Sequence, residues 1–181
     1  MTVETTFIKD LLVLTPTIFE DERGYFFESY SEALFATNGL NIPFIQDNQS
    51  LSKKGVIRGL HFQKAPYAQA KLVRVLQGEI LDVAVDLRKD SATYGQHFSI
   101  QLSAENKKQV LVPKGFAHGF SVLSSNAIVS YKVDEVYHKE SESGIQYDDP
   151  TLAINWQVNA AEVIVSDKDR VLGAFKDLNK G

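Results

Sequence analysis

Two apolar segments decide the fold: Gly55-Val-Ile-Arg-Gly-Leu-His-Phe-Gln63 and, after a short polar link, Lys71-Leu-Val-Arg-Val-Leu76. Both are rich in β-branched residues, which predicts two β-strands. Successive side chains of a strand point to opposite faces, so a period of two sorts the first segment into two sets. We expect Ile57, Gly59 and His61 on one face, and Arg58, Leu60 and Phe62 on the other.

A lysine and a histidine interrupt these apolar strands. Lys71 shares a strand face with Val73 and Val75, so a cation lies at the end of an apolar row. Burying an unpaired ammonium group is costly, although a lysine at a strand end can also extend its charge into water. His61 taken alone could equally be a hydrogen-bonded core residue. The presence of both, ten positions apart, indicates a functional site.

Composition limits the classes of function. The chain has 181 residues, a net charge of −4 and no cysteine, which suits one domain without disulfides or thiol chemistry. No basic cluster exceeds two residues, which argues against nucleic acid and anionic membranes as partners. The first twenty residues lack a secretory pattern, and no apolar run approaches the roughly 20 residues of a membrane span. We expect a soluble, cytoplasmic protein.

Short strand signals separated by turn residues follow one another along the chain. Beyond the two opening segments, extended structure is expected over residues 7–19, 44–50, 79–87, 97–102, 110–112, 116–123 and 127–133. Residues 25–30 are too aromatic for a loop, Ser31 can cap a helix that ends at Gly39, and a helix or two is expected in the last thirty residues. This pattern predicts an all-β sandwich or barrel without internal repeats or linkers.

The histidines do not form a metal-binding pattern. The four are scattered at His61, His97, His118 and His138, with no H-x-H or H-x-x-x-H spacing. A lysine beside the candidate site would also repel a divalent cation. We therefore expect no metal.

Six motifs in a fixed order carry a resemblance to a known family. They are Asp21-Glu-Arg-Gly-Tyr-Phe-Phe-Glu28, Gln46-Asp-Asn48, Arg58-Gly-Leu-His61, Lys71, Pro113-Lys-Gly-Phe-Ala-His-Gly119 and Tyr131-Lys132. Together they resemble the dTDP-4-dehydrorhamnose 3,5-epimerases, over roughly residues 3–170. The main departure is Phe62, where the family usually has tyrosine.

The resemblance implies a single cupin-type jelly-roll barrel with short C-terminal helices. An N-terminal strand extension would cover residues 1–45, the barrel core about 46–135 and a C-terminal segment 136–181. The resemblance also implies a homodimer, in which the N-terminal segment reaches into the partner subunit, and no cofactor.

The same resemblance assigns the catalytic roles. The family's substrate, dTDP-4-dehydro-6-deoxy-D-glucose, has a C4 ketone that makes the C3 and C5 protons acidic, so epimerisation needs a base, an enolate stabiliser and an acid. His61 would be the base, Lys71 the stabiliser at the C4 oxygen and Tyr131 the acid on the opposite side. Asp169 would pair with His61, although Ser166-x-x-Asp169 is also a capping pattern and Asp167 stays an alternative.

The remaining matched positions imply nucleotide-sugar binding. Arg23 and Arg58 suit the diphosphate because a guanidinium group binds phosphate oxygens in pairs, and Tyr137 would stack on thymine. Further polar contacts are expected from Glu28, Gln46, Asp47, Asn48, His118, Glu142 and Lys168. Two alternatives stay open: a 3-epimerase or 3,4-ketoisomerase with the same base and stabiliser, and a sugar-nucleotide-binding protein without catalysis.

Overall fold

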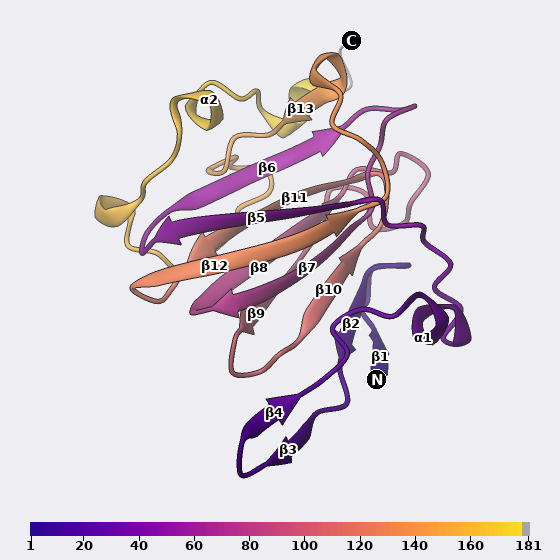
Figure 1. The fold of residues 1–181 in the computed structure, drawn as a ribbon. Coiled ribbons are helices and arrows are strands. Elements are labelled where there is room, and N and C mark those ends of the chain that lie inside the picture. The colour runs from indigo at the N-terminus through magenta and orange to yellow at the C-terminus, as the bar shows by residue number, and fades with distance from the viewer. Residues whose placement is uncertain (179–181) are drawn as a thin grey trace.

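Two antiparallel β-sheets packed face to face dominate the computed structural model, which describes residues 1–178 (Figure 1). The larger sheet has the order β1 (Thr2–Thr5), β2 (Leu12–Thr15), β10 (Gln109–Val112), β7 (Lys71–Gln77), β12 (Asn126–Val133) and β5 (Gln46–Lys53). The smaller has the order β13 (Glu142–Gly144), β6 (Ile57–Gln63), β11 (Phe116–Val122), β8 (Glu79–Asp86) and β9 (His97–Ser103). Most neighbouring strands are distant in sequence, as in a jelly roll, so the all-β prediction is confirmed.

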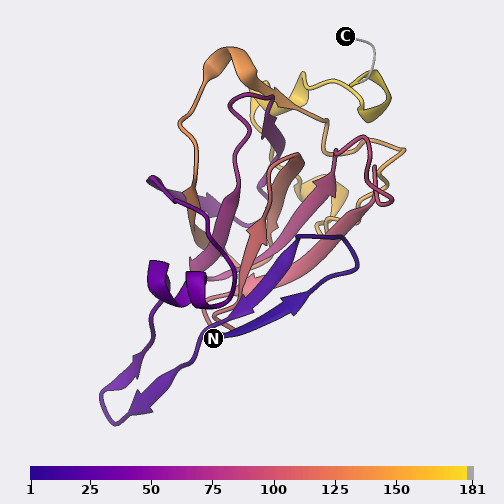
Figure 2. The same cartoon turned by 90° about the vertical axis from the view of Figure 1, so that its right-hand side faces the viewer.

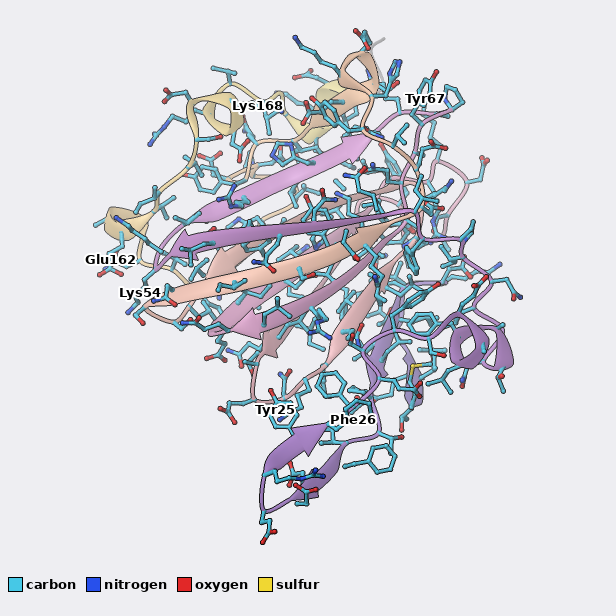
Figure 3. The ribbon with its side chains drawn as sticks, in the orientation of Figure 1. Tyr25, Phe26, Lys54, Tyr67, Glu162 and Lys168 are labelled. Carbon is cyan, nitrogen blue, oxygen red and sulfur yellow. The ribbon has the colours of Figure 1, made fainter. Side chains whose placement is uncertain are left out.

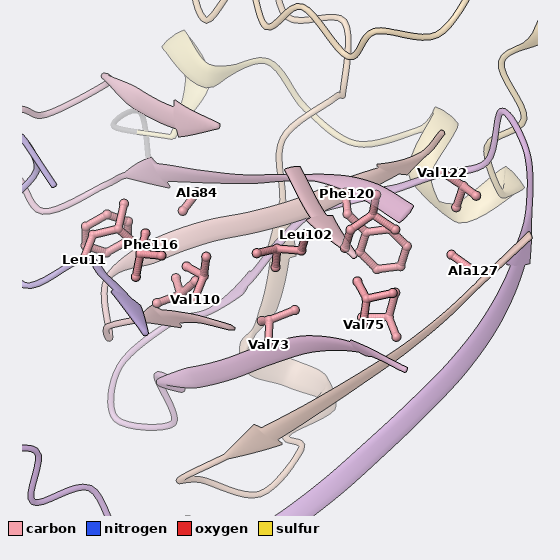
Figure 4. Packing of buried hydrophobic residues seen from close by; sticks show 14 of the residues in the cluster. Leu11, Val73, Val75, Ala84, Leu102, Val110, Phe116, Phe120, Val122 and Ala127 are labelled. Atoms are coloured by element: carbon pink, nitrogen blue, oxygen red, sulfur yellow. The ribbon is translucent and has the colours of Figure 1, made fainter. Parts of the chain in front are cut away.

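The main core fills the space between the two sheets (Figure 4). Alternate residues of β7, namely Val73 and Val75, face Ile80 and Ala84 of β8 and the aromatic ring of Phe116 in β11 within one buried cluster. The predicted row of Lys71, Val73 and Val75 therefore does point into the sandwich. Its apolar members are buried in the core, and the lysine lies where the core gives way to a cavity.

The C-terminal segment covers the outer face of the smaller sheet. The other set of β8 side chains, Leu81, Val83 and Val85, packs there against Leu152 and Trp156. The helices expected near the C-terminus are short: α2 (Asp167–Arg170) and the 3₁₀ turns η2 (Ala160–Glu162) and η3 (Phe175–Asp177), after η1 (Lys139–Ser141). The last three residues of the predicted C-terminal segment, 179–181, lie outside the described residues.

The N-terminal part includes a helix and a projecting hairpin. Helix α1 (Glu32–Thr37) begins after Ser31, as expected, and Phe35 packs on the outer face of the larger sheet. Residues 25–30 were expected to be regular, but β4 (Gly24–Phe26) stops early, because Tyr30 turns to pack edge-to-face on Phe35. β4 pairs only with β3 (Phe19–Asp21), and this hairpin extends away from the sandwich (Figures 1 and 2).

A bulge in β6 changes the alternation predicted for that strand. Arg58 pairs with Phe120 and His61 with His118, so one more residue separates the pair on β6 than on β11. Strands β6 and β11 are in close contact there: Gly59 has φ +130°, and a Cβ on it would lie 2.6 Å from the Cα of Gly119. The predicted separation of Arg58 and His61 onto opposite faces is therefore wrong. Both line the cavity inside the sandwich.

Within the part of the chain that the structure describes, no helix is long and apolar enough to cross a membrane.

Candidate active site

A cavity of about 540 Å³ lies between the two sheets where β6, β7 and β12 meet the C-terminal segment. Most of the side chains predicted for the site line it: Gln46, Asn48, Arg58, His61, Lys71, His118, Tyr131, Tyr137, Glu142, Lys168 and Asp169. Figure 3 places Lys168 on α2, at the end of the molecule away from Tyr25 and Phe26 of the hairpin. Residues from both sheets and from the C-terminal segment thus converge on one space.

His61 and Asp169 form an ion-pair contact on the smaller sheet's side of the cavity. His61 Nε2 lies 2.9 Å from Asp169 Oδ1, and the other carboxylate oxygen accepts a hydrogen bond from the Gly59 backbone N–H at 3.3 Å. Asp169 is buried in α2, where its own N–H is capped by Ser166, whereas Asp167 is exposed. The capping pattern and the pairing with His61 therefore occur together, and the geometry favours Asp169 over Asp167.

The environment of His61 favours a neutral imidazole. Burial lowers its pKa below the ordinary value of 6.5; Asp169 opposes that effect, while Lys71 and Lys168 add to it. The Asp169 carboxylate lies against Nε2 and favours a proton on that nitrogen, which leaves the free electron pair on Nδ1. Nδ1 is buried and has no hydrogen-bond partner among residues 1–178. A neutral ring with one unpaired nitrogen is the form of histidine that can act as a base.

Lys71 and Tyr131 face His61 from the larger sheet. Tyr131 pairs with Val73 and Val133 pairs with Lys71, so the lysine and the tyrosine are neighbours on the inner face of β7 and β12. Burial lowers the pKa of Lys71 to about 8, with Asp82 and Glu142 opposing it. Burial raises the pKa of Tyr131, and the nearby Arg58 opposes that rise. At neutral pH the site therefore has a proton acceptor on one sheet, and a cation and a proton donor on the other.

A second histidine–carboxylate pair lies beside the first. His118 pairs with His61 in the β6–β11 register, and its Nε2 lies 2.8 Å from Asp82 Oδ2, with both side chains buried. Asp82 escaped the sequence analysis as a site residue. A signal existed, because Asp82 shares its strand face with Ile80 and Ala84 of the core, where an acidic side chain needs a partner.

Three polar side chains form a linked group at the cavity mouth. The Tyr137 hydroxyl donates to Glu142 Oε2 at 2.7 Å, and Lys168 Nζ donates to Glu142 Oε1 at 2.5 Å. Partial burial would raise the pKa of Glu142, but these two hydrogen bonds outweigh it and hold the pKa below its usual value. On the cavity wall, the exposed Arg58 donates a hydrogen bond from Nε to Ser52 Oγ at 2.9 Å.

Three predicted residues do not line this cavity. Asp47 alternates with Gln46 and Asn48 on β5, so it points to the outer face, where it forms an ion pair with Lys132 at 2.8 Å. The prediction that Asp47 contacts the site is not supported by this placement. Arg23 lies on the projecting hairpin with 86% of its side chain exposed, paired with Asp21, and Glu28 is exposed.

The structure adds residues to the cavity that no motif indicated. Ser50, Phe62, Gln63, Gln69 and Phe120 all line it. Their types are common in strands and loops, so only their place in the fold distinguishes them. Residues 1–178 contain no group of three or more histidine, aspartate or glutamate side chains placed to hold a metal ion.

Comparison with known proteins identifies the family. The family model described as dTDP-4-dehydrorhamnose 3,5-epimerase matches residues 5–177. A relative of that name from Methanothermobacter thermautotrophicus is 51% identical over 166 residues, which is 91% of this chain and 89% of the relative. Among solved structures, the epimerase of Elizabethkingia anophelis is 52% identical, with a TM-score of 0.94, and the match covers 99% of this chain and 98% of that one.

A third match includes a bound nucleotide sugar. The dTDP-6-deoxy-D-glucose-3,5-epimerase of Legionella pneumophila, solved in complex with dTDP-4-keto-L-rhamnose, is 46% identical with a TM-score of 0.94. The match covers 99% of this chain and 95% of that one. The matches span nearly the whole length of each chain, including the segments that line the cavity. The chain belongs to the dTDP-4-dehydrorhamnose 3,5-epimerase family.

Proposed function

We propose that this protein inverts C3 and C5 of dTDP-4-dehydro-6-deoxy-D-glucose to give dTDP-4-dehydro-L-rhamnose, in dTDP-L-rhamnose biosynthesis. The observation that carries the proposal is the division of the site between the two sheets. His61 lies on the smaller sheet, whereas Lys71 and Tyr131 lie on the larger sheet that faces it. Inversion of a carbon centre requires removal of a proton on one side of the ring and delivery on the other, which this division supplies.

In the proposed reaction, the His61 imidazole takes the proton from C3 or C5, and the electron pair of the C–H bond moves toward the C4 oxygen. Lys71 stabilises the resulting enolate because its ammonium group attracts the new negative charge more strongly than it attracts the ketone. Tyr131 then donates its hydroxyl proton to the carbon from the opposite side. Asp169 holds the imidazole in the tautomer with Nε2 protonated and stabilises the imidazolium ion that forms.

The nucleotide part of the substrate is proposed to bind along β5 and at the cavity mouth. Arg58 supplies guanidinium donors, His118 lines the cavity beside His61, Gln46 and Asn48 line its β5 wall, and Tyr137 offers an aromatic face at the mouth. Glu142 and Lys168 flank that ring. The complex of the Legionella pneumophila enzyme with dTDP-4-keto-L-rhamnose supports a ligand of this class.

A homodimer is part of the proposal. The hairpin that carries Arg23 extends away from the sandwich and exposes Phe19, Tyr25 and Phe26, whose side chains would be unfavourable in water without a partner. We propose that the hairpin enters the second copy, where Arg23 meets the diphosphate and Glu28 meets the sugar nucleotide. This arrangement gives the two residues a role that their own cavity does not.

The decisive experiment is incubation with dTDP-4-dehydro-6-deoxy-D-glucose in deuterated water, after dialysis against a chelator, with mass spectrometry of the product. Two deuterons are expected, one from each centre, at a rate that the chelator does not change. One deuteron would instead identify a 3-epimerase, and a product with a C3 ketone would identify a 3,4-ketoisomerase. No exchange would leave only a binding protein, and a loss of rate restored by one divalent metal would contradict cofactor-independent chemistry.

A further inference from the structure

A junction of two loops at the cavity mouth has no role in the proposed chemistry. One loop, residues 64–70, connects β6 to β7, and the other, residues 134–138, follows β12 and carries Tyr137. Gln63, the last residue of β6, is 8% exposed and lines the cavity next to both loops. It pairs across the strands with Glu142, the residue that accepts the Tyr137 hydroxyl.

The amide group of Gln63 binds the backbone on both sides of Tyr137. Its Nε2 donates to the Val136 carbonyl at 3.1 Å and to the Tyr67 carbonyl at 2.6 Å. Its Oε1 accepts from the His138 backbone N–H at 2.8 Å. Tyr137 is therefore held between two backbone groups that bond to one side chain, and the same side chain joins this segment to the other loop.

Further contacts around Gln63 join the two loops. Gln69 Nε2 donates to the Glu135 carbonyl at 2.7 Å, and Asp134 Oδ1 accepts from the Ala70 N–H at 2.7 Å. The ring of His138 is stacked on that of Tyr67, with centroids 3.8 Å apart and an angle of 7° between the planes. Every residue of the segment 134–138 other than Tyr137 is thus tied to residues 63–70. Tyr137 itself is 57% exposed and bonds only through its hydroxyl, to Glu142, among the contacts of residues 1–178, so its ring face is open to a ligand.

We propose that Gln63 is a positioning residue for nucleotide binding. It fixes the backbone on both sides of Tyr137 and thereby orients the Tyr137 ring at the cavity mouth. The inference rests on the proposed function in one respect, since it takes the ring of Tyr137 to stack on the thymine base. Only an amide fits this position, because it donates two hydrogen bonds and accepts one. Glutamate would set a carboxylate oxygen against two carbonyls, and leucine would remove the partner of three partly buried backbone groups.

The test measures dTDP binding by calorimetry and turnover kinetics for Gln63→Leu and Gln63→Glu. We expect dTDP to bind about tenfold more weakly and KM to rise by a similar factor, with kcat within about twofold of wild type, because stacking is lost but the reacting groups are not moved. Gln77→Leu is the matched control. Gln77 ends β7, the next strand along the chain, and is exposed. Among residues 1–178, its side chain bonds only to the Asn126 side chain. This variant should bind dTDP as wild type does.

A double-mutant cycle with Tyr137→Ala separates positioning from general loosening. In the Tyr137→Ala background, Gln63→Leu should weaken dTDP binding by less than about twofold, because no ring is left to position. An equal loss in both backgrounds, unchanged binding by Gln63→Leu, or a fall in kcat alone would overturn the proposal. If Gln63→Leu does not fold, Gln63→Glu is carried through the same cycle.

A ligand-free readout keeps this inference distinct from the proposed function. Amide hydrogen exchange at His138 should be protected in the wild type and fast in Gln63→Leu, while exchange within β7 and β12 stays unchanged. Fast exchange at His138 in the wild type would overturn the inference. Failure of the wild type to bind dTDP at all would contradict the proposed function instead.

Discussion

Two clusters of buried charge in this protein have opposite designs. At the end of β8, the fully buried Asp86 carboxylate accepts hydrogen bonds from Arg88 Nε and Nη2, both at 2.9 Å, from Ser91 Oγ at 2.6 Å and from Thr93 Oγ1 at 2.7 Å. In the cavity, Lys71 makes no ion pair with any residue of 1–178, and His61 Nδ1 has no partner there. The Asp86 carboxylate is thus fully hydrogen-bonded, whereas Lys71 and His61 Nδ1 are without partners among residues 1–178.

The pKa values follow from this difference. Burial would raise the pKa of Asp86, but its hydrogen bonds, above all those from Arg88, outweigh burial and lower the pKa to about 2. Lys71 has no such bonds, and burial lowers its pKa to about 8. A buried charge that is fully paired keeps one protonation state and supports the fold, whereas an unpaired one is ready to interact with a ligand. Changes in the cavity should therefore reduce turnover, and changes at Asp86 should reduce stability.

The largest effect on turnover is expected for His61→Ala. Loss of the base should lower kcat by about 10²–10⁴, the usual range for general acid–base catalysis. Thermal unfolding should stay close to that of the wild type, because the side chain lines a cavity. Coupled measurement of kcat and melting temperature checks both parts. Near-normal turnover in the folded variant would move the base to another residue, with His118 next in line.

Lys71→Met should reduce kcat by about 10²–10³, comparable to removing one oxyanion donor. Methionine keeps most of the volume of the stem and removes the charge, so the calorimetric affinity for dTDP should be retained. Single-turnover rates and dTDP titration test the two expectations together. Collapse of dTDP affinity with a surviving single-turnover rate would make Lys71 a phosphate ligand instead.

Tyr131→Phe should separate the two halves of the reaction. The enolate still forms, but the proton returns from His61 and restores the starting configuration, so epimerisation should fall by about 10². In deuterated water, exchange into the substrate should then outrun formation of the epimer, whereas in the wild type the two rates are comparable. Joint loss of exchange and epimerisation would assign the tyrosine to deprotonation, and a normal rate of epimerisation would make it a core residue.

The pH dependence of kcat/KM should show both free groups, with about a tenfold change per pH unit outside the optimum. His61 acts when neutral, so kcat/KM should rise through a midpoint below 6.5, the ordinary pKa that burial lowers. Lys71 acts when charged, so the value should fall again through a midpoint near 8. In Lys71→Met, kcat/KM should not decrease at alkaline pH. A profile that is flat between pH 6 and 9 would contradict these assignments.

The smallest effect on turnover is expected for Asp86→Asn, whose kcat should stay within about twofold of wild type. Stability should instead fall by about 3 kcal/mol, because Arg88 loses its fully buried carboxylate partner and keeps the more exposed Asp10. In the wild type the folded pKa lies below the ordinary 3.8, so this stabilisation is complete above pH 3.8 and is lost as the pH falls toward about 2. Urea unfolding at pH 7 and in acid measures both. A variant that loses turnover but not stability would reverse the comparison.

The sequence by itself determined the class of fold and indicated the candidate residues for the proposed chemistry. Period-two alternation is a local property of the sequence. Lys71-Leu-Val-Arg-Val and Glu79 to Asp86 could therefore be assigned to strands, and Lys71 to the inner face, before the tertiary structure was known. The conflict of a cation with an apolar row marked the site. The family motifs, which occur in a fixed order, indicated His61, Tyr131 and Asp169.

Only the tertiary structure decided which of these side chains meet. The bulge at Gly59, which depends on close contact with β11, brings Arg58 to the side of His61. Because the two sheets face each other, His61 and Tyr131 lie on opposite walls of the cavity. Alternation along β5 directs Asp47 away from the cavity, to its ion pair with Lys132. The three hydrogen bonds of Gln63 reach the loops that follow β6 and β12, which are strands of different sheets. These features are contacts between residues far apart in the chain, and no local pattern encodes them.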